Sequence, residues 1–135
     1  MRSPDFLTAV GIGVSDLARS EDFYARVLGM KRTAVFKLAE MDEVMLAHEG
    51  RSAVVLMHYT DGRAISYRDN PVKLVFYVTD PAAMIEAIRA EGLAITLEPA
   101  PNASLGGAVV GMGKDPDGYG VELIQAPARA DAPTG

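Results

Sequence analysis

The sequence predicts an α+β fold in which one unit, a strand followed by a helix and three further strands, occurs twice. Apolar strands are expected at residues 9–14 and 73–78. Each is followed by a similar helix start, Ser15-Asp16 in the first half and Thr79-Asp80 in the second. A short side-chain oxygen at such a position can accept an amide hydrogen bond of the first helical turn. This internal repeat predicts two βαβββ modules.

In the first module the helix should start at Leu17 and stop near Gly29, because glycine suits the left-handed cap at a helix C-terminus. Its apolar stripe is formed by Leu17, Phe23, Tyr24, Val27 and Leu28. Turn-forming or charged residues then separate strand candidates at residues 33–38, 43–48 and 53–59.

In the second module Pro81 fits the first turn of a helix that should end at Gly92. Strands are expected at residues 93–97, 108–112 and 120–124, with a tight turn at residues 115–118 (Asp-Pro-Asp-Gly). Gly111 and Gly113, inside a strand, should allow bulges or curvature around a ligand. The expected organisation is one domain, 1–135, with a first module at 6–60, a linker at 61–70, a second module at 71–126 and a flexible tail at 127–135.

Composition restricts the possible chemistry. The 135 residues include no cysteine, so disulfides, thiolate metal sites and cysteine nucleophiles are excluded, and His48 and His58 are the two histidines. The formal net charge of −5 argues against nucleic acid or an anionic membrane as a partner. The N-terminal residues show no apolar signal segment, so the cytoplasm is the expected location.

Two motifs carry a family resemblance. Residues 10–17 (VGIGVSDL), with Asp22-Phe23-Tyr24 and residues 27–30, resemble the first module of the vicinal-oxygen-chelate superfamily. Residues 115–124 (DPDGYGVELI) resemble its closing turn and strand. This superfamily includes glyoxalase I, bleomycin-resistance proteins, extradiol dioxygenases and fosfomycin-resistance enzymes. The resemblance spans roughly residues 7–126 and implies a glyoxalase-like fold whose curved, mixed sheets enclose a cavity, together with a homodimer.

The resemblance also implies where metal-dependent members hold their ion. They place one ligand on the first strand and one on the last strand of each module, which corresponds here to Ala9, Leu56, Lys73 and Glu122. A catalytic divalent ion typically needs three nitrogen or oxygen ligands from the protein. Only Glu122 is of a ligand type, because alanine and leucine lack a donor atom and a protonated ammonium cannot coordinate. We therefore expect no metal site and no cofactor.

Since the resemblance implies that positions 73 and 122 converge, we expect an ion pair between Lys73 and Glu122 in the space of the missing metal. Leu74 and Phe76 are strongly apolar and need a core, so strand alternation places Lys73, Val75 and Tyr77 on the opposite, cavity face. The alternative is that Lys73 points outward and Glu122 lies at a rim.

His58 shares a strand face with Leu56 and is the imidazole we place inward, where it could act as a general acid or base. The alternative is a partly exposed histidine at a strand end. The expected catalytic candidates are Glu122, Lys73 and His58. The expected ligand-binding residues are Ala9, Leu56, His58, Lys73, Val75, Tyr77 and Glu122.

These residues favour a protein that binds a small, partly apolar organic molecule in a metal-free cavity. One alternative is a metal-independent lyase or isomerase that uses Lys73, Glu122 or His58 for proton transfer. A divalent-metal-dependent lyase or dioxygenase is a second alternative, and it requires the assumed strand register to be wrong by a residue or two.

Overall fold

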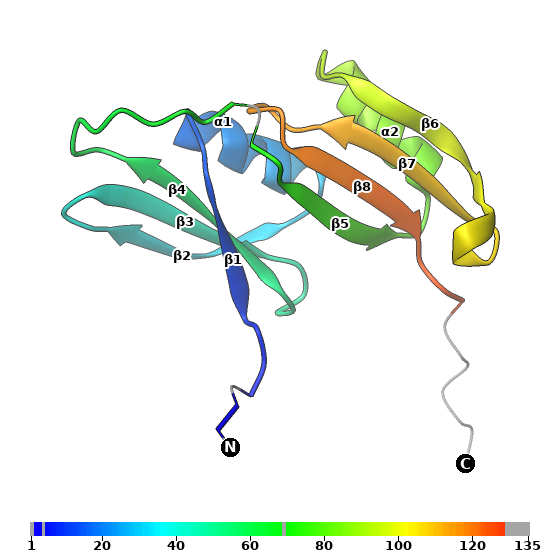
Figure 1. The fold of residues 1–135 in the computed structure, drawn as a ribbon, viewed down its shortest axis with the longest axis horizontal. Helices are drawn as coiled ribbons and strands as arrows, with labels where there is room; N and C mark the ends of the chain where they lie inside the picture. The colour runs from blue at the N-terminus through cyan, green and yellow to red at the C-terminus, as the bar shows by residue number, and fades with distance from the viewer. Residues whose placement is uncertain (1, 4, 69, 129–135) are drawn as a thin grey trace. The chain divides into compact units, whose positions relative to one another are not determined.

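The computed structural model describes residues 2–3, 5–68 and 70–128, and these form two compact units. The first unit contains the described residues up to Asn70 together with Pro116–Gly118, and the second contains the others from Pro71 onward. Each unit has one four-stranded mixed sheet (Figure 1). None of the helices in the described ranges is long and apolar enough to cross a membrane.

The first unit has the expected order of a strand, a helix and three strands. Its sheet runs β1-β4-β3-β2, with β1 parallel to β4 and the other pairs antiparallel. The elements are β1 (Ala9–Gly13), α1 (Leu17–Asp22), a π-helical segment (Phe23–Val27), β2 (Lys31–Lys37), β3 (Met41–Ala47) and β4 (Ala53–Tyr59).

The helix of the first unit begins where the sequence predicts, because the Asp16 side chain accepts a hydrogen bond from the backbone N–H of Arg19 at 3.0 Å. Its second half is a π-helix, which differs from the expected continuous α-helix. The change of helix type coincides with the burial of two consecutive aromatic residues, Phe23 and Tyr24. Alternate residues of the sheet complete this core, among them Ile12, Val44, Leu46 and Leu56.

The second unit repeats this topology. Its sheet runs β5-β8-β7-β6, with β5 parallel to β8, and Figure 1 shows these two strands side by side. The elements are β5 (Lys73–Val78), α2 (Pro81–Ala90), β6 (Ile95–Asn102), a 3-10 turn (Ala103–Leu105), β7 (Ala108–Lys114) and β8 (Gly120–Gln125).

Helix α2 packs closely on β7, because two glycines of that strand lie beneath it. A Cβ atom at Gly111 would lie 2.7 Å from Cγ1 of Ile85, and one at Gly113 would lie 3.0 Å from Cγ2 of Ile88. Both isoleucines are completely buried. The expectation that these glycines allow curvature around a ligand is therefore corrected, since they allow the helix to approach the sheet.

The strands begin and end close to their expected positions. The largest difference is β6, which continues to Asn102 although the expected strand stops at residue 97. It is an edge strand, so Pro99 and Pro101 remove few ladder hydrogen bonds. Residues 129–135 of the expected tail lie outside the described residues.

Candidate functional site

The expected ion pair between Lys73 and Glu122 is present in the second unit. Lys73 is the residue on β5 opposite Gly120 of β8, and Glu122 lies two positions further along β8. The Nζ atom of Lys73 lies 3.3 Å from Oε2 of Glu122. The Lys73 side chain is 50% exposed and that of Glu122 is 18% exposed, so one end of the pair reaches solvent.

The face of the second sheet that carries this pair is open along β5, whereas α2 covers the opposite face. Val75 and Tyr77, which follow Lys73 at alternate positions, are 53% and 70% exposed. On β8, Val121 and Leu123 alternate with Glu122, so their side chains lie on the other face of the sheet. Both are completely buried. The alternation therefore follows the sequence-based expectation for Lys73, Val75 and Tyr77.

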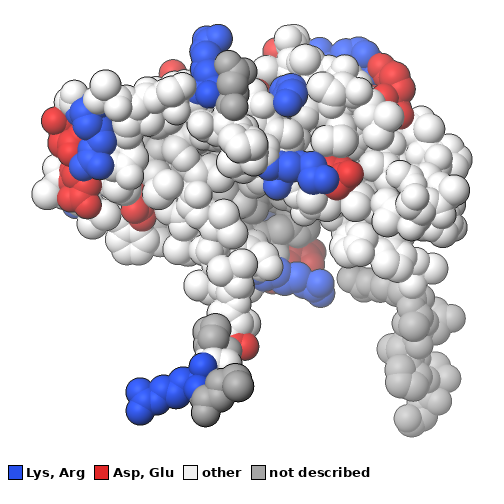
Figure 2. Space-filling view, viewed as in Figure 1, with Lys and Arg blue, Asp and Glu red and all other residues white. Residues whose placement is uncertain are grey.

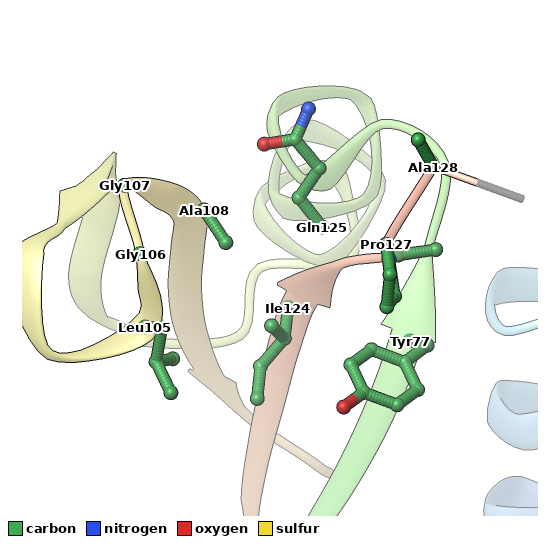
Figure 3. Close-up of a pocket in the computed structure, with 10 residues that line it drawn as sticks. Tyr77, Leu105, Gly106, Gly107, Ala108, Ile124, Gln125, Pro127 and Ala128 are labelled. Atoms are coloured by element: carbon green, nitrogen blue, oxygen red, sulfur yellow. The ribbon is translucent and has the colours of Figure 1, made fainter. Parts of the chain in front are cut away.

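A pocket of about 450 Å³ lies at the end of β5 and β8 furthest from Gly120. Figure 3 shows Tyr77 and Ile124 on neighbouring strands, with Leu105 on the turn opposite. Ile124 and Glu122 are two residues apart on β8, so their side chains lie on the same face of the sheet. The pocket and the ion pair therefore belong to one face. Of the pocket residues, Tyr77 is expected from the sequence, whereas Leu105 and Ile124 are not. The pocket is lined by Tyr77, Leu105, Gly106, Gly107, Ala108, Ile124, Gln125, Ala126, Pro127 and Ala128.

The first sheet corrects the position assigned to Leu56. Ala9 lies opposite Ala53 just as Lys73 lies opposite Gly120, so the residue equivalent to Glu122 is Val55. Leu56 is completely buried, on the face that carries the core residues. The assumed register was therefore wrong by one residue, which moves a side chain to the other face of the sheet. Val55 also lacks a donor atom, so the correction adds no metal ligand.

His58 also lies on the face of Leu56 and not on that of Val55. Its Nδ1–H donates to the carbonyl oxygen of Val14 at 2.9 Å. Its ring stacks on that of Tyr67, with centroids 5.9 Å apart. The inward placement of His58 is thus corrected, because backbone and aromatic contacts hold it in a structural position.

The donor chemistry does not fit the metal that the family resemblance implies. Of the four corresponding positions, Ala9, Val55 and Lys73 offer no ligand, and Glu122 alone is a carboxylate. Among the described residues no group of three or more histidine, aspartate or glutamate side chains could hold an ion. A transition ion typically requires three such ligands.

Acidic and basic side chains lie beside one another at several places on the surface drawn in Figure 2. An ion-pair cluster joins α2 and β6, where Arg89 contacts Glu98 at 2.7 Å and Glu86 at 3.2 Å. Hydrogen bonds to Glu98 and then Glu86 raise the pKa of the Arg89 guanidinium. These pairs are exposed and contribute little to stability.

Comparisons with known proteins agree with this architecture. A putative lactoylglutathione lyase from Brassica oleracea var. gemmifera is 36% identical over 121 residues, which cover 83% of this chain and 41% of the relative. A probable lactoylglutathione lyase from Vibrio cholerae is 32% identical over 117 residues, covering 83% and 84% respectively. The chain thus spans less than half of the plant relative's length and most of the bacterial one.

A solved structure of a glyoxalase I mutant from Zea mays superposes with a TM-score of 0.78 at 25% identity, covering 90% of this chain and 45% of the maize chain. The model of the Glyoxalase/Bleomycin resistance protein/Dioxygenase superfamily matches residues 7–123. The chain therefore belongs to the Glyoxalase/Bleomycin resistance protein/Dioxygenase superfamily.

Proposed function

We propose that this protein binds a small, partly apolar organic molecule on the open face of the second sheet, without a resident metal ion. The observation that carries the proposal is the substitution of the expected ligand on β5 by Lys73, whose ammonium lies 3.3 Å from Glu122. An ammonium and a carboxylate together offer a hydrogen-bond donor and an acceptor. They can orient a polar group without a metal.

The rest of the face suits the apolar part of such a molecule. Val75 and Tyr77 are both more than half exposed, and the 450 Å³ pocket opens beside Tyr77 and Ile124. Sites for small molecules typically combine apolar lining with a few polar groups that fix orientation. Burial of about 100 Å² of this apolar surface would contribute roughly 2.5 kcal/mol to binding.

A second candidate is a metal-independent lyase or isomerase, and the names of the relatives support the lyase. In this chain Glu122 and Lys73 would carry the proton transfer, because they are the charged pair on the open face. His58 lies on the other face of its own sheet, and its Nδ1–H is engaged by Val14. The donor set gives no support to the metal-dependent alternative.

A thermal-shift screen of small organic molecules, run with and without a chelator, tests the proposal. Because a ligand that binds only the folded state raises the midpoint of unfolding, we expect hits whose shift does not depend on the chelator. Tyr77→Ala should abolish these shifts, while the matched control Phe36→Ala, an exposed aromatic on β2, should retain them.

Mass spectrometry of the hits after incubation separates the two candidates. Recovery of every hit unaltered supports a binding protein. Turnover that Glu122→Gln abolishes, with the fold intact by circular dichroism, supports the lyase or isomerase. Hits that require an added metal, or that do not respond to Tyr77→Ala, contradict the proposed site.

A further inference from the structure

The open face of the second sheet carries a second cation, Lys114, that the ion pair does not use. Gly111 and Gly113 of β7 face α2, so alternation places Met112 and Lys114 on the open face. Lys114 lies opposite Gly120 of β8, and so does Lys73 from the other side. Two lysines thus flank one glycine across three neighbouring strands.

Gly120 leaves the space between these lysines without a side chain. A Cβ atom there would lie 3.4 Å from Cγ of Lys73, so even a methyl group would touch the lysine stem. Adjacent strands are about 4.8 Å apart, which puts the two lysine Cα atoms roughly 10 Å from each other. Two long side chains at this spacing can reach one small group held above the glycine.

The charges on this face do not cancel. Strands β5 to β8 contain four charged residues: Lys73, Glu98, Lys114 and Glu122. Glu98 is paired with Arg89 of α2 at 2.7 Å. The strand residues of the open face therefore include two lysines and the single carboxylate of Glu122, which leaves one excess positive charge among them.

The carboxylates of the turn that follows Lys114 are directed to other partners. Oδ1 of Asp115 accepts from the backbone N–H of Tyr119 at 2.9 Å. Asp117 accepts from the backbone N–H of Ser15 at 3.1 Å and lies 3.4 Å from Arg19. Within the part of the chain that the structure describes, Lys114 forms no ion pair.

From this arrangement we infer that the preferred ligand is an organic monoanion, a carboxylate or sulfonate joined to an apolar body. The anionic group lies over Gly120 between Lys73 and Lys114, and the body lies beside Glu122 along Val75 and Tyr77 of β5 toward the pocket. Charge-assisted hydrogen bonds are roughly twice as strong as neutral ones, so the anion adds affinity that an uncharged analogue lacks. This inference rests on the proposed function and specifies its ligand class.

Two fluorescent probes test the inference directly. 8-Anilinonaphthalene-1-sulfonate is an aromatic monoanion, and N-phenyl-1-naphthylamine has the same body without the sulfonate. Titrated into the folded full chain, the sulfonate should bind at least about tenfold more tightly. Lys114→Met should raise the Kd of the sulfonate about tenfold and leave that of the neutral probe within about twofold, with Lys114→Arg restoring most of the loss.

Lys31→Met is the matched control, because Lys31 is an exposed strand lysine of the first unit. It should leave both Kd values unchanged, and circular dichroism should show that every variant is folded, since the sulfonate also binds molten states. Equal Kd values for the two probes, or no response to Lys114→Met, would overturn the inference. If both probes bind equally and Tyr77→Ala weakens the binding of both, the inference fails but the proposed function stands. If Tyr77→Ala changes the binding of neither probe, the proposed function fails together with the inference.

Discussion

The ammonium of Lys73 and the carboxylate of Glu122 lie 3.3 Å apart on neighbouring parallel strands, at positions where the family resemblance implies metal ligands. The pair is half open to solvent at its lysine end. Exposed ion pairs contribute little to stability, because water screens their attraction. The ion pair therefore contributes little to the stability of the fold, and its two charged groups can interact with a ligand.

We predict that Lys73→Met changes the free energy of unfolding by less than about 1 kcal/mol in urea denaturation. Lys37→Met is the control, because Lys37 forms a similar exposed pair with Asp42 at 3.2 Å. The two variants should behave alike. A loss of about 3 kcal/mol or more for Lys73→Met alone would indicate a buried, structural pair instead.

The corrected register of the first sheet can be tested by placing a carboxylate on each face. Leu56→Glu should destabilise the protein by at least about 3 kcal/mol or prevent folding, because it buries an unpaired charge. Val55→Glu should cost about 1 kcal/mol, since this position is only partly buried. Denaturation of both variants gives the comparison, and the reverse order would restore the register expected from the sequence.

Helix α2 should be sensitive to a single methyl group on β7. Gly111→Ala would place its Cβ atom 2.7 Å from the buried Ile85, and the resulting strain should cost about 1–3 kcal/mol. Gly120→Ala has only an ordinary contact, 3.4 Å from Lys73, and serves as the control. Thermal unfolding should show a lower midpoint for Gly111→Ala and little change for the control. Equal midpoints would mean that the helix can move away from the strand.

Asp117 connects the turn at residues 115–118 to the start of α1. It is 6% exposed and accepts hydrogen bonds from both the backbone N–H and the hydroxyl of Ser15. Asp117→Asn replaces one acceptor oxygen by a donor, so we predict a loss of about 1–3 kcal/mol. Asp16→Asn is the control, because asparagine caps a helix as well as aspartate does. Similar stabilities of the two variants in urea would contradict this role for Asp117.

The repeated strand-helix-strand order was predictable because apolar periodicity and helix caps are local signals. Edge strand β6 was underestimated because prolines normally end a strand, and only the sheet order shows that Pro99 and Pro101 lie at an edge. The register of β4 was not predictable either. Leu56 and Val55 are adjacent apolar residues, and their faces are set by pairing with β1.

The same limit explains what the sequence missed at the site. Lys73 and Glu122 could be paired through the resemblance. Lys114 could not be assigned to the site from the sequence, because its position opposite Gly120 depends on the pairing of β7 with β8. The expected homodimer and cytoplasmic location stay predictions.

Equilibrium dialysis against nickel, zinc, manganese and ferrous iron, followed by elemental analysis of the protein, tests the metal-free account most directly. With only Glu122 available as a ligand among the four positions, we predict no stoichiometric binding at micromolar metal for the wild-type chain or for Lys73→Met. One equivalent of a tightly held ion that Glu122→Gln releases would contradict the account.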